Sequence, residues 1–154
     1  MLMGAMLALG HVLQAQTFQI STNMLGDAFH SGGPIGFTDI DNDGMDDIIL
    51  FDQGEDVNIL YQTPSGFIKV HYGEVSNSNQ WGACIGDMNN DGIKDIFAGG
   101  SYDGVHLMRI GSGGNFQLDD LDNGSMFMQA CNMADLDNDG VLDAFGCHDD
   151  ALSR

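Results

Sequence analysis

Basic residues are scarce in this 154-residue chain: Lys69, Lys94, Arg109 and Arg154 stand against 23 Asp and Glu, for a formal net charge of −19. Proteins that bind nucleic acid neutralise its phosphates with Lys and Arg. The charge balance therefore argues against nucleic acid and against an anionic membrane surface as partners. Long aliphatic runs are also few, whereas Gly is abundant, with 22 residues. This composition is typical of a turn-rich, all-β chain.

Cysteine is sparse and odd in number, with Cys84, Cys131 and Cys147. None has CxxC spacing, so we do not expect a zinc site. Cys131 and Cys147 are spaced so that they could lie opposite each other on adjacent strands of a hairpin. A disulfide, which an exported chain permits, and two buried thiols both remain open for this pair. Cys84 has no evident partner.

The sequence motifs of catalysis are missing: there is no GxSxG, no HExxH and no phosphate-binding glycine loop. Four histidines occur singly: His11, His30, His71 and His106. We expect His106, which sits between two apolar residues, to face outward from a strand. We interpret His148-Asp149-Asp150 as a solvated loop after a strand, not as an acid–base cluster. The chain is predicted to carry no catalytic site of its own.

The N-terminus is the one extended apolar stretch. Residues 1–15 are apolar and end in Leu13-Gln14-Ala15, which is acceptable as a signal-peptide cleavage site, although a basic segment before them is missing. An ordinary buried segment is the alternative. Because the stretch is too short for an ordinary membrane-spanning helix, we expect no membrane insertion. We predict a signal peptide at 1–15 and a secreted or cell-surface protein.

An aspartate loop is present three times with a period of 48 residues: DIDNDGMDD (39–47), DMNNDGIKD (87–95) and DLDNDGVLD (135–143). Each copy has oxygen-bearing side chains at positions 1, 3, 5 and 9, and Gly at position 6. Such oxygens bind hard cations, and Ca²⁺, with roughly six to eight oxygen ligands, fits them better than Mg²⁺. We predict one Ca²⁺ per loop, bound by these side chains and the backbone carbonyl of position 7.

The predicted ligands are Asp39, Asp41, Asp43, Met45 and Asp47 in the first loop, Asp87, Asn89, Asp91, Ile93 and Asp95 in the second, and Asp135, Asp137, Asp139, Val141 and Asp143 in the third. Asn89 replaces a carboxylate, and Lys94 adds a positive charge within the second loop. That site is therefore predicted to be the weakest. An EF-hand is excluded, because position 12 is never Glu and short apolar strands, not helices, follow the loops.

The repeat extends beyond the loops. At the same 48-residue offset Val57 matches Val105 and Ile59 matches Leu107, in segments whose partial alternation predicts a half-buried strand. An outer strand recurs at 17–20, 66–70 and 115–118. One unit is thus four short strands, with the aspartate loop as the hairpin turn between the first two. Its length is that of a β-propeller blade.

These loops, with an apolar strand and Gly99-Gly100 after the second, resemble the FG-GAP/VCBS repeat family over residues 17–154. The resemblance implies a β-propeller, calcium at the hairpin loops, and adhesion, ligand binding or a scaffold role. The all-β chain would form a partial propeller of about two and a half four-stranded blades at 16–154, whereas propellers have roughly four to eight. We favour a fragment of a longer chain over assembly with other copies.

Two functions stay open. The first is a non-catalytic, calcium-stabilised module that contacts a protein or glycan ligand. The second is the propeller part of a larger secreted polysaccharide-active enzyme whose catalytic residues lie outside this chain. Trp81 with Tyr61, Tyr72 and Tyr102 could form a sugar-stacking platform, but we favour core or blade-interface packing for Trp81.

Overall fold

The computed structural model describes residues 19–20, 22–26, 28–30, 32–122 and 126–148. In this part of the chain the strands form three antiparallel sheets, ordered β1-β2-β3-β4, β5-β6-β7-β8 and β9-β10. The strands are β1 (Ile35–Thr38), β2 (Asp47–Asp52), β3 (Asp56–Thr63), β4 (Gly66–Glu74), β5 (Gln80–Gly86), β6 (Asp95–Gly100), β7 (Val105–Ile110), β8 (Phe116–Asp122), β9 (Met128–Ala134) and β10 (Asp143–His148). Two short 3₁₀ turns are η1 (Thr22–Met24) and η2 (Ser112–Gly114).

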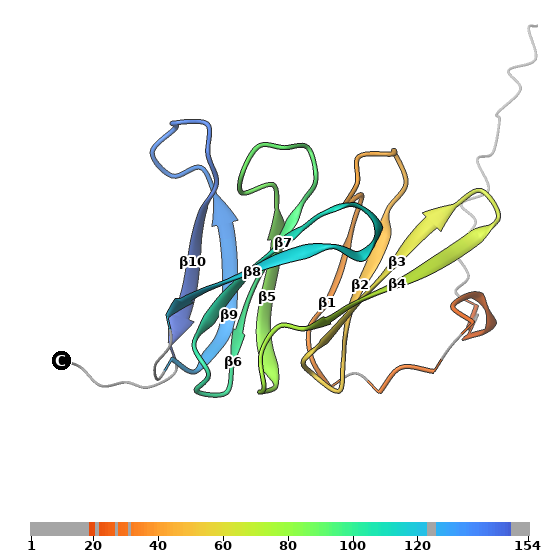
Figure 1. The fold of residues 1–154 in the computed structure, drawn as a ribbon, viewed down its shortest axis with the longest axis horizontal. Coiled ribbons are helices and arrows are strands. Elements are labelled where there is room, and N and C mark those ends of the chain that lie inside the picture. Colours follow the sequence, from red (N-terminus) through yellow and green to blue (C-terminus); the bar gives the residue numbers. More distant parts are fainter. Residues whose placement is uncertain (1–18, 21, 27, 31, 123–125, 149–154) are drawn as a thin grey trace, which may run out of the picture.

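The three sheets lie side by side in chain order, with the three aspartate loops, which join β1 to β2, β5 to β6 and β9 to β10, at one end (Figure 1). The first strands of neighbouring sheets contact each other, β1 with β5 and β5 with β9. This arrangement confirms the predicted all-β fold and the four-strand unit. The described residues contain two complete four-stranded sheets and one hairpin, and they form no closed ring.

The core lies between the sheets. One cluster joins Ile49, Val57 and Ile59 of the first sheet to Ile96 and Met108 of the second. Another joins the second sheet to β9, and consists of Phe97, Val105, Leu107 and Met128. Alternate residues of β6 and β7 thus face opposite neighbours, because side chains alternate along a strand.

This packing corrects two expectations. The strands at 56–61 and 104–109 are not half-buried: four consecutive residues of β3 and of β7 are buried, since neighbours cover both faces. His106 does not face outward. It is buried, because it lies on the same face of β7 as Met108, which is turned toward the first sheet.

Close approach of the second and third sheets depends on Gly82 of β5. A Cβ atom at this position would lie 3.1 Å from the backbone nitrogen of Ala130 in β9. That separation is tighter than ordinary van der Waals contact, so the two backbones can approach this closely only because Gly82 has no side chain.

The outer strands predicted at 66–70 and 115–118 are confirmed as β4 and β8. The strand predicted at 17–20 is not: residues 17 and 18 lie outside the described part, and Gln19 and Ile20 are not in a strand. The predicted signal peptide at 1–15 lies outside the described residues. Among the helices that the structure describes, none is long and apolar enough to cross a membrane.

Candidate metal centre

The three aspartate loops connect β1 to β2, β5 to β6 and β9 to β10, as the sequence predicts. Each loop bends at two residues with left-handed backbone angles, at positions 4 and 6. At position 4, Asn42, Asn90 and Asn138 have φ of 60°, 58° and 62°, and at position 6, Gly44, Gly92 and Gly140 have φ of 90°, 90° and 88°. Asn and Gly are the residues that tolerate these angles. The three loops therefore share one backbone shape, set by their own sequence.

The aspartate at position 1 organises each loop. In the first loop the backbone N–H of Asp43 donates to Asp39 Oδ1 across 3.0 Å, and that of Gly44 donates to Oδ2 across 2.9 Å. Asp87 accepts from Asp91 and Gly92, and Asp135 from Asp139 and Gly140, in the same way. These bonds wrap the loop around the first carboxylate.

Carboxylates converge in the first and third loops. Oxygen atoms of Asp39, Asp41 and Asp43 lie within 4.8 Å of one another, and so do those of Asp135, Asp137 and Asp143. Several unpaired carboxylates in one turn repel each other, and oxygen ligands of this kind are those that Ca²⁺ prefers. The donor set in both loops therefore fits a calcium ion.

The second loop differs at Asn89. Its side-chain amide donates to Asp91 Oδ2 across 3.0 Å, so that one oxygen of Asp91 is already engaged. Among the described residues no group of three carboxylates gathers in this loop. The prediction that this site is the weakest stays a prediction, and the Asn89–Asp91 contact gives it a structural reason.

Position 9 has a role that the sequence did not reveal. Asp47 is buried, and its two carboxylate oxygens accept from the backbone N–H groups of Ile40, across 3.0 Å, and of Gln62, across 2.8 Å. Asp95 accepts from Met88 and Ile110 in the same manner. Each carboxylate thus ties its loop to the third strand of the sheet. Burial raises the pKa of Asp47 and of Asp95, and the amide bonds oppose that rise.

Asp143, at position 9 of the third loop, is exposed and accepts from Leu136 across 2.9 Å. Unlike Asp47 and Asp95, it belongs to a group of converging carboxylates. The residues whose carbonyls were predicted as ligands, Met45, Ile93 and Val141, each donate their own backbone N–H to the carboxylate at position 5. Metal binding by the position 7 carbonyls, and by Asp47 and Asp95, stays a prediction.

Neighbouring loops are also joined directly. The side-chain amide of Asn42 donates to the carbonyl oxygen of Gly92, and that of Asn90 donates to Gly140 O across 3.1 Å. The ammonium group of Lys94 donates to Asp39 O, so its charge reaches the first loop as well as the second. The sequence feature that could have predicted these contacts between loops is the Asn at position 4, which is present in all three loops.

The chain was compared with models of known families. The model described as FG-GAP-like repeat matches residues 39–98 and 87–146, which together include all three aspartate loops. This chain belongs to the FG-GAP-like repeat family. No curated protein and no solved structure matches it significantly. In this FG-GAP-like chain both matches contain the second aspartate loop, at 87–95. The matches therefore follow the same repeat as the sheets.

The cysteines correct a further expectation. Cys131 pairs in register with Gly146, and Cys147 with Ala130, so Cys131 and Cys147 are not directly opposite. The three thiols are free, and Cys84, for which no partner was expected, contacts Cys131 across the interface between the second and third sheets. A hydrogen bond between these two sulfurs lowers the pKa of Cys84 and raises that of Cys131. Contacts between sheets cannot be read from spacing within one hairpin.

The aromatic residues divide into two groups. Tyr61 and Tyr72 share a hydrogen bond of 2.6 Å between their hydroxyls, and burial and this contact raise the pKa of Tyr61. Core packing of Trp81 is wrong, since this residue is 55% exposed, but its ring lies 5.4 Å from that of Phe127, which directly precedes β9, so packing between neighbouring units is borne out. The centre of the Tyr102 ring, which is 57% exposed, lies 5.0 Å from the centre of the Phe127 ring. Trp81, Tyr102 and Phe127 form an exposed aromatic cluster.

His148 ends β10, where it is exposed and accepts from the backbone N–H of Phe127 across 3.1 Å. It therefore belongs to the strand, not to the loop that we predicted. Asp149 and Asp150 lie outside the described residues.

Proposed function

We propose that this chain is a non-catalytic, calcium-stabilised repeat module, secreted or held at a cell surface, which acts in adhesion, ligand binding or carbohydrate contact. The observation that carries the proposal is the convergence of carboxylates in hairpin loops that are joined to one another. Family membership adds support, since FG-GAP-like repeats are generally found in extracellular proteins and often bind Ca²⁺.

Calcium has a structural task in this proposal. Asp39, Asp41 and Asp43 of the first loop, and Asp135, Asp137 and Asp143 of the third, would hold one ion each. The bound ion would supply positive charge that cancels the repulsion between the carboxylates. Because the side chains of Asn42 and Asn90 hydrogen-bond to the next loop, an ion that stabilises one loop would also stabilise its neighbour.

The exposed aromatic cluster supports carbohydrate contact. Trp81 and Tyr102 present more than half of their surface to solvent, next to Phe127. Aromatic side chains of this kind are enriched at interfaces, because an apolar face and a polar tip suit a partly hydrated partner. The bridge between Ser101 and Phe127 holds the cluster across the second and third sheets.

Two measurements test the proposal. Calorimetric titration with CaCl₂ should show binding to the chain, and binding to immobilised glycans should depend on calcium and weaken in Trp81→Ala. Phe37→Ala is the matched control, because Phe37 is an exposed aromatic residue of β1 outside the cluster. An absence of calcium binding, or an equal effect of both substitutions, would contradict the proposal. Polysaccharide incubated with the chain should remain uncut.

A further inference from the structure

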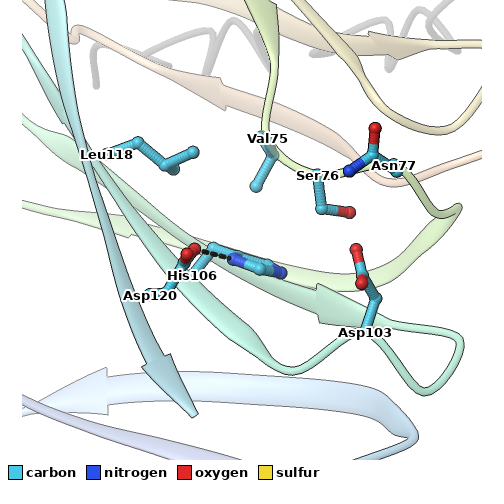
Figure 2. Close-up of a pocket in the computed structure, with 7 residues that line it drawn as sticks. All are labelled: Val75, Ser76, Asn77, Asp103, His106, Leu118 and Asp120. Atoms are coloured by element: carbon cyan, nitrogen blue, oxygen red, sulfur yellow. Dashed lines mark hydrogen bonds and ion pairs between the residues drawn. The ribbon is translucent and has the colours of Figure 1, made fainter. Parts of the chain in front are cut away.

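A cavity of about 230 Å³ lies on the first-sheet side of the second sheet, away from the aspartate loops. Val75, Ser76 and Asn77 line it from the linker between β4 and β5, and Asp103 from the turn between β6 and β7. His106 of β7, with Leu118 and Asp120 of β8, completes the wall (Figure 2). Two carboxylates and no Lys or Arg line this cavity.

His106 presents an unpartnered acceptor at this wall. Its Nδ1 lies 2.8 Å from Asp120 Oδ1, and its side chain is only 6% exposed. An ionised carboxylate accepts but cannot donate, so Nδ1 carries the proton, and Nε2 is an acceptor whenever the ring is neutral. Nε2 is buried and has no hydrogen-bond partner. In Figure 2 it points away from Asp120, toward the side on which Ser76 and Asp103 lie.

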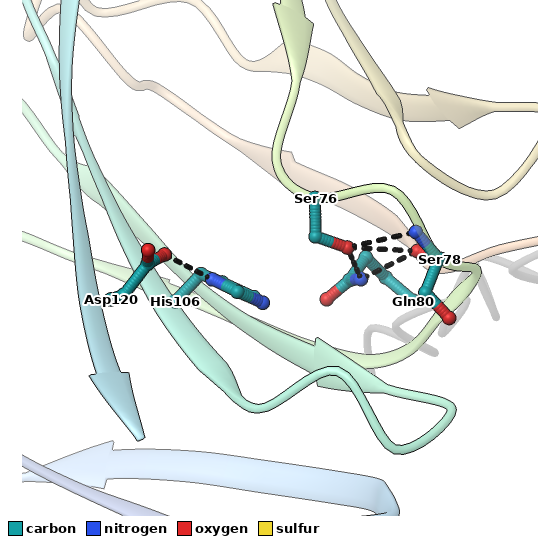
Figure 3. A network of polar contacts seen from close by, with 5 residues as sticks. All are labelled: Ser76, Ser78, Gln80, His106 and Asp120. Carbon is teal, nitrogen blue, oxygen red and sulfur yellow. Dashed lines mark hydrogen bonds and ion pairs between the residues drawn. The ribbon is translucent and has the colours of Figure 1, made fainter. Parts of the chain in front are cut away.

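Gln80, which contacts Ser76 of the cavity wall, has a second unpartnered acceptor. Its amide nitrogen donates to Ser76 Oγ across 2.8 Å and to the carbonyl oxygen of Ser78 across 2.7 Å. Because a carbonyl only accepts, this contact determines which end of the amide is the nitrogen. The remaining atom, Oε1, is buried without a partner and faces the His106 side of the network (Figure 3). Unsatisfied buried polar atoms are rare in native proteins and call for an explanation.

The first sheet shows that the repeat does not require this arrangement. Asn58 occupies the position equivalent to His106 and is also buried, but its side-chain amide donates to Asp56 O across 3.2 Å. The histidine of the first sheet, His71, lies on the outer strand β4, where it is exposed and pairs with Asp56 across 2.9 Å. Only the second of these two sheets buries its histidine and leaves Nε2 without a partner.

We propose that this cavity binds a primary ammonium group, such as that of a lysine side chain or an amino sugar. An ammonium group has three N–H donors and no acceptor. One donor would serve His106 Nε2 and another the carboxylate of Asp103, which is half-buried and has no hydrogen bond or ion pair within the described residues. Asp120 adds negative charge, and Val75 and Leu118 offer an apolar wall to an aliphatic stem.

The test uses the full chain loaded with calcium and n-butylammonium chloride as the probe. Imidazole ¹⁵N spectra should show a saturable shift at His106 Nε2 and none at His71, whose Nε2 is already bound to Asp56. n-Butanol, which has the same stem without the charge, should give no shift. Nα-acetyllysine and glucosamine then distinguish a peptide source of the ammonium group from a sugar source.

Variants make the assignment specific. Asp103→Asn should weaken n-butylammonium binding about tenfold or more, as loss of one hydrogen bond to a charged group predicts. His106→Asn, which installs the residue of the first sheet, should abolish it. Asp56→Asn is the matched control and should bind as the parent does. Three results would overturn the proposal: no saturable shift with n-butylammonium, binding by Asp103→Asn equal to that of the parent, or a shift of the His106 signal with ZnCl₂ but not with n-butylammonium. Calcium titration of the same samples reports separately on the loops.

Discussion

The side-chain amide of Asn90 in the second loop donates to the carbonyl oxygen of Gly140 in the third loop, across 3.1 Å. The same bond joins Asn42 of the first loop to Gly92 of the second. Each links position 4 of one loop to position 6 of the next, and so passes from sheet to sheet in the register of the repeat. The residue that must adopt a left-handed angle is also the residue that reaches the neighbouring loop.

Asn90→Gly tests this connection. Gly keeps the left-handed angle but removes the amide, so the free energy of unfolding in urea with calcium should fall by about 1 kcal/mol, the usual net value of a hydrogen bond. Asn138→Gly is the matched control, since Asn138 has the same angle but no such contact in the described part of the chain. Equal destabilisation by the two variants would argue against a role for the contact between loops.

Removal of calcium should lower the melting temperature well beyond any effect of ionic strength. Carboxylates that converge in the first and third loops repel each other without the ion. Binding to the native state alone stabilises it by about 2.7 kcal/mol per site at roughly a hundredfold excess over the dissociation constant. Thermal melts in CaCl₂, in EDTA and in EDTA with matched NaCl measure the effect. An unchanged melt in EDTA would show that the loops hold their shape without metal.

Asn89→Asp should raise the calcium affinity of the second loop, by roughly 1 kcal/mol or about fivefold, because it restores a carboxylate and removes the amide that engages Asp91. Asp41→Asn, at the same position of the first loop, should lower calcium affinity. Calorimetric titration of both variants against the parent compares the sites. If the second loop still bound calcium no more tightly than in the parent after Asn89→Asp, then Lys94, not Asn89, would limit its calcium affinity.

Stability without metal should depend on pH through Asp47 and Asp95. Burial raises the pKa of both in the folded state, so the folded chain binds these protons more tightly than the unfolded chain does. The contribution of these two groups to metal-free stability should therefore be complete below the ordinary aspartate pKa and should be lost as the pH rises through the raised pKa values of the folded state. The free energy of unfolding, measured with urea from acid to neutral pH, should have a smaller slope against pH in Asp47→Asn than in the parent. Asp46→Asn, at the exposed neighbouring carboxylate, should leave the slope unchanged.

The chain in isolation should self-associate. Within the described residues β10 pairs only with β9, so its other edge has unpaired backbone groups, and Phe145 on this strand is 67% exposed. Open edges and uncovered apolar residues favour pairing with another chain. Light scattering of the segment from Gln16 at micromolar concentration should detect oligomers, and Phe145→Ser should reduce them. A cooperative, calcium-bound monomer would mean that the strands cover this edge themselves.

Local features could be predicted because neighbouring residues determine them. Gly at position 6 and Asp at position 1 shape each loop within nine residues, so the hairpins, their calcium-type donor sets and the four-strand unit followed from spacing. Position 9 was predicted only in part. The sequence pattern predicts Asp47 as an oxygen ligand, whereas its hydrogen bond to Gln62 depends on the position of the third strand.

The sequence by itself determined the repeat, its register, the loop chemistry and the all-β class. Only the tertiary structure decided which residues meet across sheets: it buried His106, placed Cys84 beside Cys131 and exposed Trp81 next to Phe127. The physical reason is that strand periodicity fixes which residues share a face, but not what covers that face. Here neighbouring sheets cover both faces, so the burial of a polar residue such as His106 depends on a partner far away in the chain.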